Sequence, residues 1–223
     1  MTESERTQSI SHKIWNWIDK RTKLGTFFPK TIPKHSSINP AYCLGGITFL
    51  CFIVSGVTGV TLAIHYQPNP EQAYNSIGFI ISEVPFGSVI RNLHRWSANA
   101  MIFFCILHMI RVFFSGAYKS PRELNWIAGT LLLFITLGFG FSGYLLPWDE
   151  EAFLASNIGI TIAATIPYIG PTIARFLMAG ERIAGPTLAR FYAFHLVVFP
   201  IATVALLVVH FYLVKKHGIA RQL

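Results

Sequence analysis

Segment 91–108 reads RNLHRWSANAMIFFCILH and segment 191–210 reads FYAFHLVVFPIATVALLVVH. Each contains two histidines separated by an apolar run, 14 residues apart in the first segment and 15 in the second. These histidines are His94, His108, His195 and His210. Both intervals are close to four helical turns, so each pair should lie on one helix face with an axial rise of about 21 Å. That rise covers most of the ~30 Å hydrocarbon core of a bilayer, which predicts two membrane helices with a histidine near each surface.

The composition also indicates a membrane protein. The 223 residues are 52% hydrophobic and 13% charged, which is too apolar for an ordinary soluble domain. Four apolar runs are each long enough to cross a bilayer, which takes about 20 helical residues. These runs are 41–64, 87–116, 125–147 and 190–214. We therefore predict an all-α integral membrane fold, with a four-helix transmembrane bundle over 41–218, an N-terminal segment 1–40 and a tail 219–223.

The basic residues are distributed unevenly over this topology. Thirteen of the 18 Lys and Arg side chains lie in segment 1–40, around the connection between the second and third runs, or after the fourth run. These regions share one side of a four-helix arrangement, so the positive-inside rule places both termini in the cytoplasm, or in the stroma of a plastid. The net charge of +8 then indicates topology and lipid contact rather than nucleic-acid binding.

The segments outside the four runs carry weaker signals. Residues 10–20 alternate apolar and polar side chains at helical spacing, which predicts an amphipathic helix on the membrane surface. Segment 66–90 contains no Lys or Arg, and we interpret it as a loop. The connection 148–189 is long for a loop, so we expect short amphipathic helices there, on the non-cytoplasmic face.

Four glycines repeat the histidine interval. Gly45 and Gly59 in the first run are 14 residues apart, as are Gly129 and Gly143 in the third run. Glycines in membrane helices commonly allow close helix packing, which is one interpretation. The shared interval favours another. Two flat macrocycles, one at each histidine level, need room from the neighbouring helices, and glycine leaves that room.

The four histidines are candidate metal ligands. A single histidine in a membrane helix can be a packed, hydrogen-bonded residue, a proton relay or a ligand. Two helices with the same two-level spacing favour two haem irons, each held by one imidazole from either helix. The resulting pairs are His94 with His195 and His108 with His210. Zinc sites need clustered tetrahedral ligands at short spacings, which this pattern lacks.

Several arginines lie close to these histidines in the sequence. Arg91 and Arg95 flank His94, and Arg190 precedes His195. They are either surface charges at helix ends or partners of haem propionates, which suit the donor fork of a guanidinium. Comparable candidates at the other level, for which snorkelling at helix ends is an equal explanation, are Lys119, Arg122 and Lys215.

Several motifs together resemble cytochrome b6, the family of short cytochromes b in Rieske/cytochrome b complexes. They are HRWS at 94–97, KSPRELNW at 119–126, GYLLPWD at 143–149, AYCLGGIT at 41–48 and RFYAFH at 190–195. The resemblance covers about residues 13 to 218, and the 15-residue histidine interval is similar to that of the b6 type. The sequence departs from the family in an N-terminal extension, in segment 150–187 and in the last stretch, 215–223.

The resemblance implies a redox role within a complex. Quinol would be oxidised near the positive side, with one electron going to a separate Rieske iron–sulfur protein. The other would pass through the haem of His94 and His195, then through the haem of His108 and His210, to quinone. The residues implied for the wall of the quinol pocket are Tyr144, Pro147 and Trp148.

The resemblance also implies partner proteins. The family's Pro-Glu-Trp-Tyr motif is absent from this sequence, so we expect a separate subunit-IV-like chain to complete the quinol pocket. A c-type cytochrome or plastocyanin as electron acceptor and a homodimeric complex are implied in the same way. The location would be a bacterial cell membrane or a thylakoid.

Cys43 is a candidate for covalent haem attachment. A lone cysteine in an apolar run usually acts as a small buried hydrophobe. Cys43, however, lies two residues before Gly45, at the predicted level of His108 and His210, and its surroundings resemble the b6 segment that binds an extra c-type haem. The resemblance thus implies a third haem held through one thioether. Cys51, about two turns deeper, we treat as core.

Two other functions are compatible with parts of this pattern. A di-haem b membrane anchor of a hydrogenase or formate dehydrogenase type enzyme would also place histidine pairs in four helices. The glycine pairs, the stretch 143–149 and Cys43 argue against it. A non-redox channel or scaffold requires that the protein carry no b-type haem.

Overall fold

The computed structural model of this chain describes residues 42–218. In this part every regular element is a helix, and four helical stretches are long and apolar enough to cross a membrane. They are Leu44–Ala63, Gly87–Phe114, Glu123–Leu145 and Gly185–His217. This confirms the predicted four-helix transmembrane bundle. The predicted amphipathic helix at 10–20 and the tail 219–223 lie outside the described residues.

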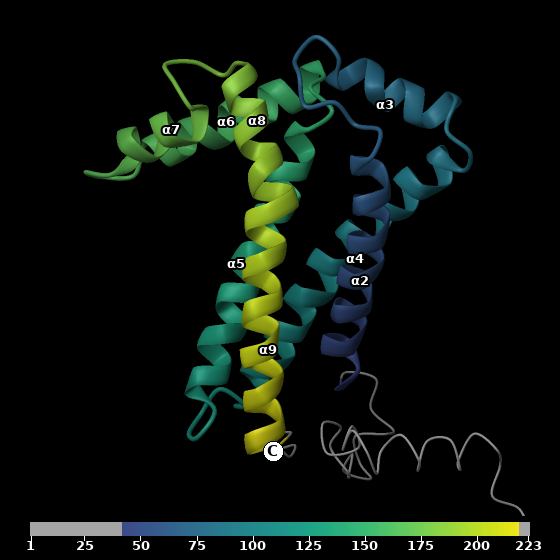
Figure 1. The fold of residues 1–223 in the computed structure, drawn as a ribbon. Coiled ribbons are helices and arrows are strands. Elements are labelled where there is room, and N and C mark those ends of the chain that lie inside the picture. The colour runs from purple at the N-terminus through teal and green to yellow at the C-terminus, as the bar shows by residue number, and fades with distance from the viewer. Residues whose placement is uncertain (1–41, 219–223) are drawn as a thin grey trace, which may run out of the picture.

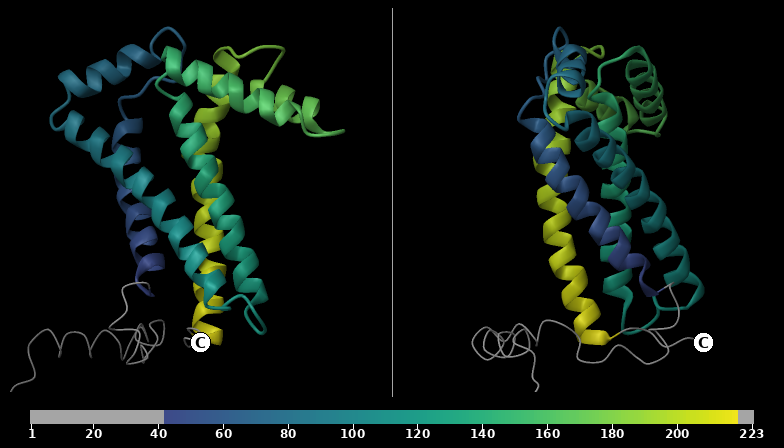
Figure 2. Two further views of the ribbon diagram at one scale, coloured as in Figure 1. Left: turned by 180° about the vertical axis from the view of Figure 1, so that it is seen from behind. Right: turned by 90° about the vertical axis from the view of Figure 1, so that its right-hand side faces the viewer.

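The four spans form two closely packed pairs (Figures 1 and 2). Helix α2 (Leu44–Ala63) packs along α4 (Gly87–Phe114), and α5 (Glu123–Leu145) packs along α9 (Phe199–His217). The start of α2, the α4–α5 connection and the end of α9 lie at one end of the bundle, which we call the basal end. Short helices cross the opposite end, which we call the capped end.

The first of these short helices was not predicted. Segment 66–90 was interpreted as a loop, but α3 (Ala73–Ser82) occupies its middle. Ala73, Ser76 and Ile80 are its buried residues, and their spacing is helical; a single turn or two of this period is a weak signal in a sequence. The corner to α4 requires glycine, because a Cβ on Gly87 would lie 1.8 Å from the Ile80 carbonyl oxygen.

The connection 148–189 contains short helices, as expected. Helix α6 (Glu150–Ala164) begins where the Asp149 side chain accepts a hydrogen bond from the Ala152 N–H at 2.8 Å. Acidic residues in its first turn also suit the positive end of the helix dipole. Helix α7 (Gly170–Met178) follows, with a proline in its first turn. Figure 1 shows α6 and α7 extending sideways from the capped end.

The fourth span is interrupted by a wide turn. It consists of α8 (Gly185–Ala193), the π turn η4 (Phe194–Val198) and α9. The Phe199 N–H donates to the Phe194 carbonyl, five residues back, and Pro200 has no N–H to restore the normal pattern. The wide turn takes up one extra residue. His195 and His210 therefore share one helix face although their interval is one residue longer than that in α4.

Candidate functional site

Two of the predicted ligands face each other in the capped half of the bundle. His94 on α4 and His195 in η4 have ring centroids 6.3 Å apart, with the ring planes inclined by 67°. Two metal–nitrogen bonds of about 2.0 Å each account for about 4 Å of this separation between ring centres. The remainder, roughly 1.1 Å for each ring, matches the distance from the centre of an imidazole ring to its nitrogen. The pair therefore fits one metal ion held between two axial nitrogens, as in a six-coordinate haem.

The Nδ1 atoms of both rings have hydrogen-bond partners. His94 Nδ1 lies 3.0 Å from the Ser55 carbonyl oxygen and 3.1 Å from Thr58 Oγ1. His195 Nδ1 lies 2.9 Å from Ser142 Oγ. With Nδ1 engaged in this way, Nε2 is the nitrogen of each ring that can bind a metal.

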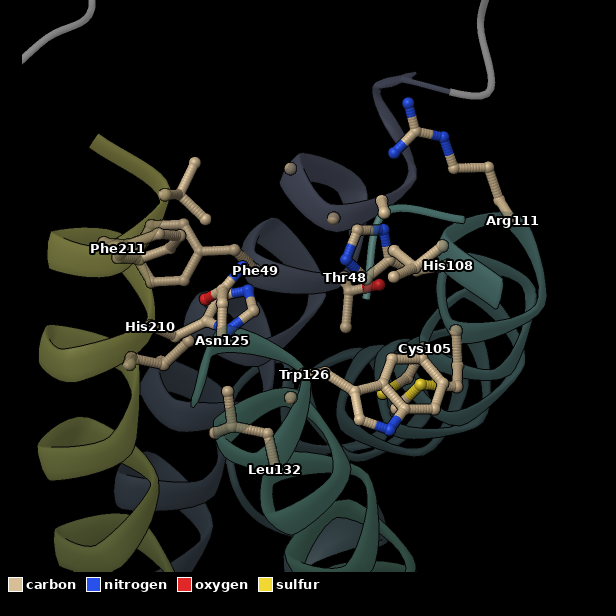
Figure 3. A pocket seen from close by; sticks show the side chains of 18 of the residues that line it. Thr48, Phe49, Cys105, His108, Arg111, Asn125, Trp126, Leu132, His210 and Phe211 are labelled. Atoms are coloured by element: carbon tan, nitrogen blue, oxygen red, sulfur yellow. The ribbon is translucent and has the colours of Figure 1, made fainter. Parts of the chain in front are cut away.

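The other two histidines line one cavity of about 270 Å³ in the basal half (Figure 3). His108 and His210 enter it from helices on opposite sides. Its wall also carries buried polar atoms that have no hydrogen-bond partner among the described residues, and these are His108 Nδ1, His210 Nδ1, Arg111 Nη2, Asn125 Oδ1 and Thr203 Oγ1. Burying unpaired polar groups is costly, so the cavity suits an apolar ligand with polar or anionic edges, as a haem is.

Each of the four predicted glycines faces a different histidine. The pairs are Gly45 with His108, Gly59 with His94, Gly129 with His210, and Gly143 with His195. A Cβ added to these glycines would lie between 2.8 and 3.5 Å from Cε1 of the paired histidine. Because glycine has no side chain, each of these positions leaves room for the edge of the imidazole ring that faces it. Consequently α2 can approach α4, and α5 can approach α9, at both histidine levels.

The structure gives the three arginines named beside the capped histidines different surroundings. Arg190 donates from Nη1 to the Phe176 carbonyl near the end of α7, and its guanidinium lies 4.9 Å from the centre of that phenyl ring. Arg91 is half-buried and Arg95 is exposed, both on α4.

Arg111 lines the basal cavity, although the sequence pattern did not single it out. Its Nη2 is buried and has no hydrogen-bond partner within residues 42–218, and its guanidinium lies 4.0 Å from the centre of the Tyr42 ring. The available signal was its position three residues after His108, which puts both side chains on one helix face. Arg122, named as a candidate for this level, also lines the cavity, and its Nη2 donates to the His217 carbonyl at 3.2 Å.

The residues expected at the quinol pocket lie together at the capped end of α5. Tyr144 is in the last turn of α5 and is half-exposed, and Trp148 has a left-handed φ of 54° just after Pro147. The Tyr66 hydroxyl braces this corner by donating to the Leu146 carbonyl at 2.7 Å. Burial raises the pKa of Tyr66 above its ordinary value, so the hydroxyl keeps its proton.

Cys43 lies at the N-terminus of α2, at the basal end. Its thiol is exposed, whereas Cys51 is half-buried and Cys105 is buried. Tyr42, which precedes Cys43, and Gly45, two residues after it, line the basal cavity. The thiol is therefore placed beside the cavity of His108 and His210 but outside its wall.

Comparison with known proteins agrees with this geometry. The family model described as "Cytochrome b/b6/petB" matches residues 30–218. The chain is 44% identical to cytochrome b6 of Heliobacterium modesticaldum over 209 residues, which is 92% of this chain and 98% of that protein. It is 38% identical to the menaquinol:cytochrome c reductase cytochrome b subunit of Geobacillus thermodenitrificans, covering 94% of this chain and 98% of that one.

A solved structure is similar over most of the chain. A chain of a hyperthermophilic respiratory Complex III superposes with a TM-score of 0.79 at 28% sequence identity. The match covers 92% of this chain and 55% of that chain, so the present chain spans about half the length of that relative.

Proposed function

The chain belongs to the cytochrome b/b6 family, and on this premise we propose that its two histidine pairs hold two b-type haems and carry electrons between the two membrane surfaces. Membership makes it a multi-pass membrane protein and an electron-transfer subunit of a bc- or b6f-type complex. It also sets aside the hydrogenase-type anchor and the non-redox channel. The observation that carries the proposal is the approach of His94 to His195 at a separation that fits one iron.

The chain's own residues decide where the haems sit and what surrounds them. When bound, a haem iron takes up and releases single electrons. His94 and His195 would hold one haem, and His108 and His210 the other, through Nε2. The two levels are about 21 Å apart along the helices. Because moving one charge across the membrane works against about 2.3 kcal/mol per 100 mV, this spacing divides the crossing into steps.

Cationic side chains at the two levels are proposed partners of the haem propionates. Arg91 and Arg95 lie within one turn of His94, in the capped half of α4. Arg111 is the stronger candidate at the basal level, because its buried Nη2 has no other partner among the described residues. Arg190 would have to leave the Phe176 carbonyl in order to reach a propionate.

We propose that quinol is oxidised at the capped end and quinone is reduced at the basal end. Tyr144, Pro147 and Trp148 would form part of the quinol-pocket wall, supported by the exposure of Tyr144 and the fixed corner around Leu146. A Rieske iron–sulfur protein would take the first electron and pass it to a c-type cytochrome or plastocyanin. A subunit-IV-like chain would complete the pocket, within a homodimeric complex.

Cys43 is the proposed attachment point of a c-type haem. The support is its exposed thiol at the end of α2, beside the cavity of His108 and His210. The two residues that follow it, Leu44 and Gly45, carry no nucleophile or metal ligand. A single thioether would fix this haem to the chain next to the basal b haem, where quinone reduction is proposed.

The test is the haem content of the purified complex. His94→Ala and His195→Ala should each remove one b haem from the reduced-minus-oxidised spectrum, whereas His108→Ala and His210→Ala should each remove the other. The loss should be complete, because each iron takes one ligand from each helix pair. A variant at His65, which lies outside the two levels, is the matched control and should keep both. Two b haems remaining in any of the four ligand variants would contradict the assignment.

A further inference from the structure

Two hydroxyl side chains distinguish the capped histidine level from the basal level. Thr58 immediately precedes Gly59, and Ser142 immediately precedes Gly143. Both residues are buried, with 6% exposure for Thr58 and 1% for Ser142. Each is also bonded to Nδ1 of the histidine that its neighbouring glycine faces. The residues before the two basal glycines are apolar, Leu44 and Ala128.

The direction of these hydrogen bonds follows from where the hydroxyl protons go. A hydroxyl has one proton to donate. Thr58 Oγ1 donates to the Val54 carbonyl at 2.7 Å, and Ser142 Oγ donates to the Phe139 carbonyl at 3.2 Å. Each oxygen is then left as an acceptor toward its histidine, which must carry its proton on Nδ1.

The helix pair is held in place around the first of these contacts. Ser55, whose carbonyl oxygen also accepts from His94 Nδ1, has its hydroxyl 2.7 Å from Ser97 Oγ on α4. Ser97 in turn donates to the His94 carbonyl at 3.0 Å. The hydrogen bond between Thr58 and His94 is therefore one of several that join α2 to α4 at this level.

We propose that Thr58 and Ser142 are positioning residues that set the midpoint potential of the capped-end haem below that of the basal haem. This inference rests on the proposed function. A histidine that donates its outer N–H becomes a more basic ligand, and a more basic ligand stabilises the ferric over the ferrous iron. Among residues 42–218, no hydroxyl hydrogen-bonds to Nδ1 of His108 or His210, and the His210 ring has only the Asn125 backbone carbonyl beside it. Electron transfer from the capped to the basal haem is then downhill.

Redox titration of the two b haems in the intact complex tests the inference. Thr58→Val and Ser142→Ala should each raise the midpoint potential of the capped-end haem and leave the basal haem unchanged. The two effects should be similar in size, because a backbone carbonyl remains beside each ring, that of Ser55 for His94 and that of Phe139 for His195. Losing a hydrogen-bond partner of a metal ligand typically changes metal affinity or activity by at least about tenfold. For the double variant we therefore expect about a tenfold change in the ferric-to-ferrous ratio, which corresponds to about 59 mV for one electron.

Matched controls exist on the same two helices. Thr61 Oγ1 bonds the Val57 carbonyl on α2, and Thr130 Oγ1 bonds the Trp126 carbonyl on α5, both in the same local pattern as Thr58 but without a histidine. Thr61→Val and Thr130→Val should leave both potentials unchanged. The wave that belongs to the capped-end haem is identified as the one lost in His94→Ala.

A converse variant keeps the test decisive if the first variants do not assemble. Ala128 is 5% exposed and precedes Gly129, so Ala128→Ser would put a hydroxyl next to His210. It should lower the potential of the basal haem alone. Two b haems with no shift in any of these variants would overturn the inference. Absence of b haem from the wild-type complex would instead contradict the proposed function, so the two failures are distinguishable.

Discussion

At the scale of single residues, the three cysteines show how position changes the chemistry open to one side-chain type. Cys105 is buried within α4 and Cys51 is half-buried in the middle of α2, where a thiol acts as a small apolar group. Cys43 is exposed at the first end of the same helix. Only an accessible thiol with open space around it has room for covalent attachment to a macrocycle.

A denaturing gel stained for haem peroxidase activity tests the attachment at Cys43. Noncovalent b haems are lost on denaturation, so the wild-type band should retain one haem through its thioether. Cys43→Ser should lose that stain completely while both b haems stay in the native spectrum. Cys51→Ser, on the same helix, is the control and should stain like the wild type. An unstained wild-type band from assembled complex would remove the third haem from the proposal.

At the scale of secondary structure, the π turn η4 reconciles two different histidine intervals. In α4 the 14 residues between His94 and His108 fit a regular helix. In the fourth span, 15 residues of regular helix would turn His210 about 100° further relative to His195 than His108 is turned relative to His94, since each added residue turns a helix by about 100°. The π turn removes most of this rotation, and Pro200 helps to fix where it occurs.

The π turn predicts an asymmetry between deletion and insertion. Deleting Val198 should convert η4 to regular helix with a 14-residue interval, and both b haems should remain. Inserting an alanine after Val198 adds a second extra residue that one π turn does not take up, so His210 rotates by about 100° and the basal haem should be lost. The reduced-minus-oxidised spectrum measures both outcomes. An insertion variant with two b haems, or a deletion variant with one, would contradict this role for η4.

These elements also mark how far the sequence could predict the structure. Long runs with regular histidine and glycine intervals predicted the four spans and both histidine levels, because each interval repeats a helical period. The same intervals could not say that each glycine contacts one imidazole, since this depends on which helices pair. Helix α3 has only a short stripe of buried residues. The π turn η4 depends on the backbone hydrogen-bond pattern next to Pro200, which has no N–H to donate. Neither feature leaves a strong periodic signal.

At the scale of the whole molecule, the bundle has two unlike ends. The α4–α5 connection and the two ends of the described chain lie at the basal end, and α3, α6 and α7 lie at the capped end (Figures 1 and 2). Among the described residues, Lys and Arg are equally numerous at both ends. The basic excess that supports a cytoplasmic basal end therefore comes chiefly from segment 1–40.

Labelling of single introduced cysteines with a membrane-impermeant thiol reagent tests this orientation. Tyr168 is fully exposed in the turn between α6 and α7 at the capped end, and Lys119 is exposed in the α4–α5 connection at the basal end. In intact cells Tyr168→Cys should be labelled above the wild-type level, and Lys119→Cys should not. After permeabilisation both variants should be labelled above the wild type, in which Cys51 is half-buried, Cys105 is buried and Cys43 is the proposed thioether. Labelling of Lys119→Cys but not Tyr168→Cys in intact cells would reverse the orientation, and with it the ends assigned to quinol oxidation and quinone reduction.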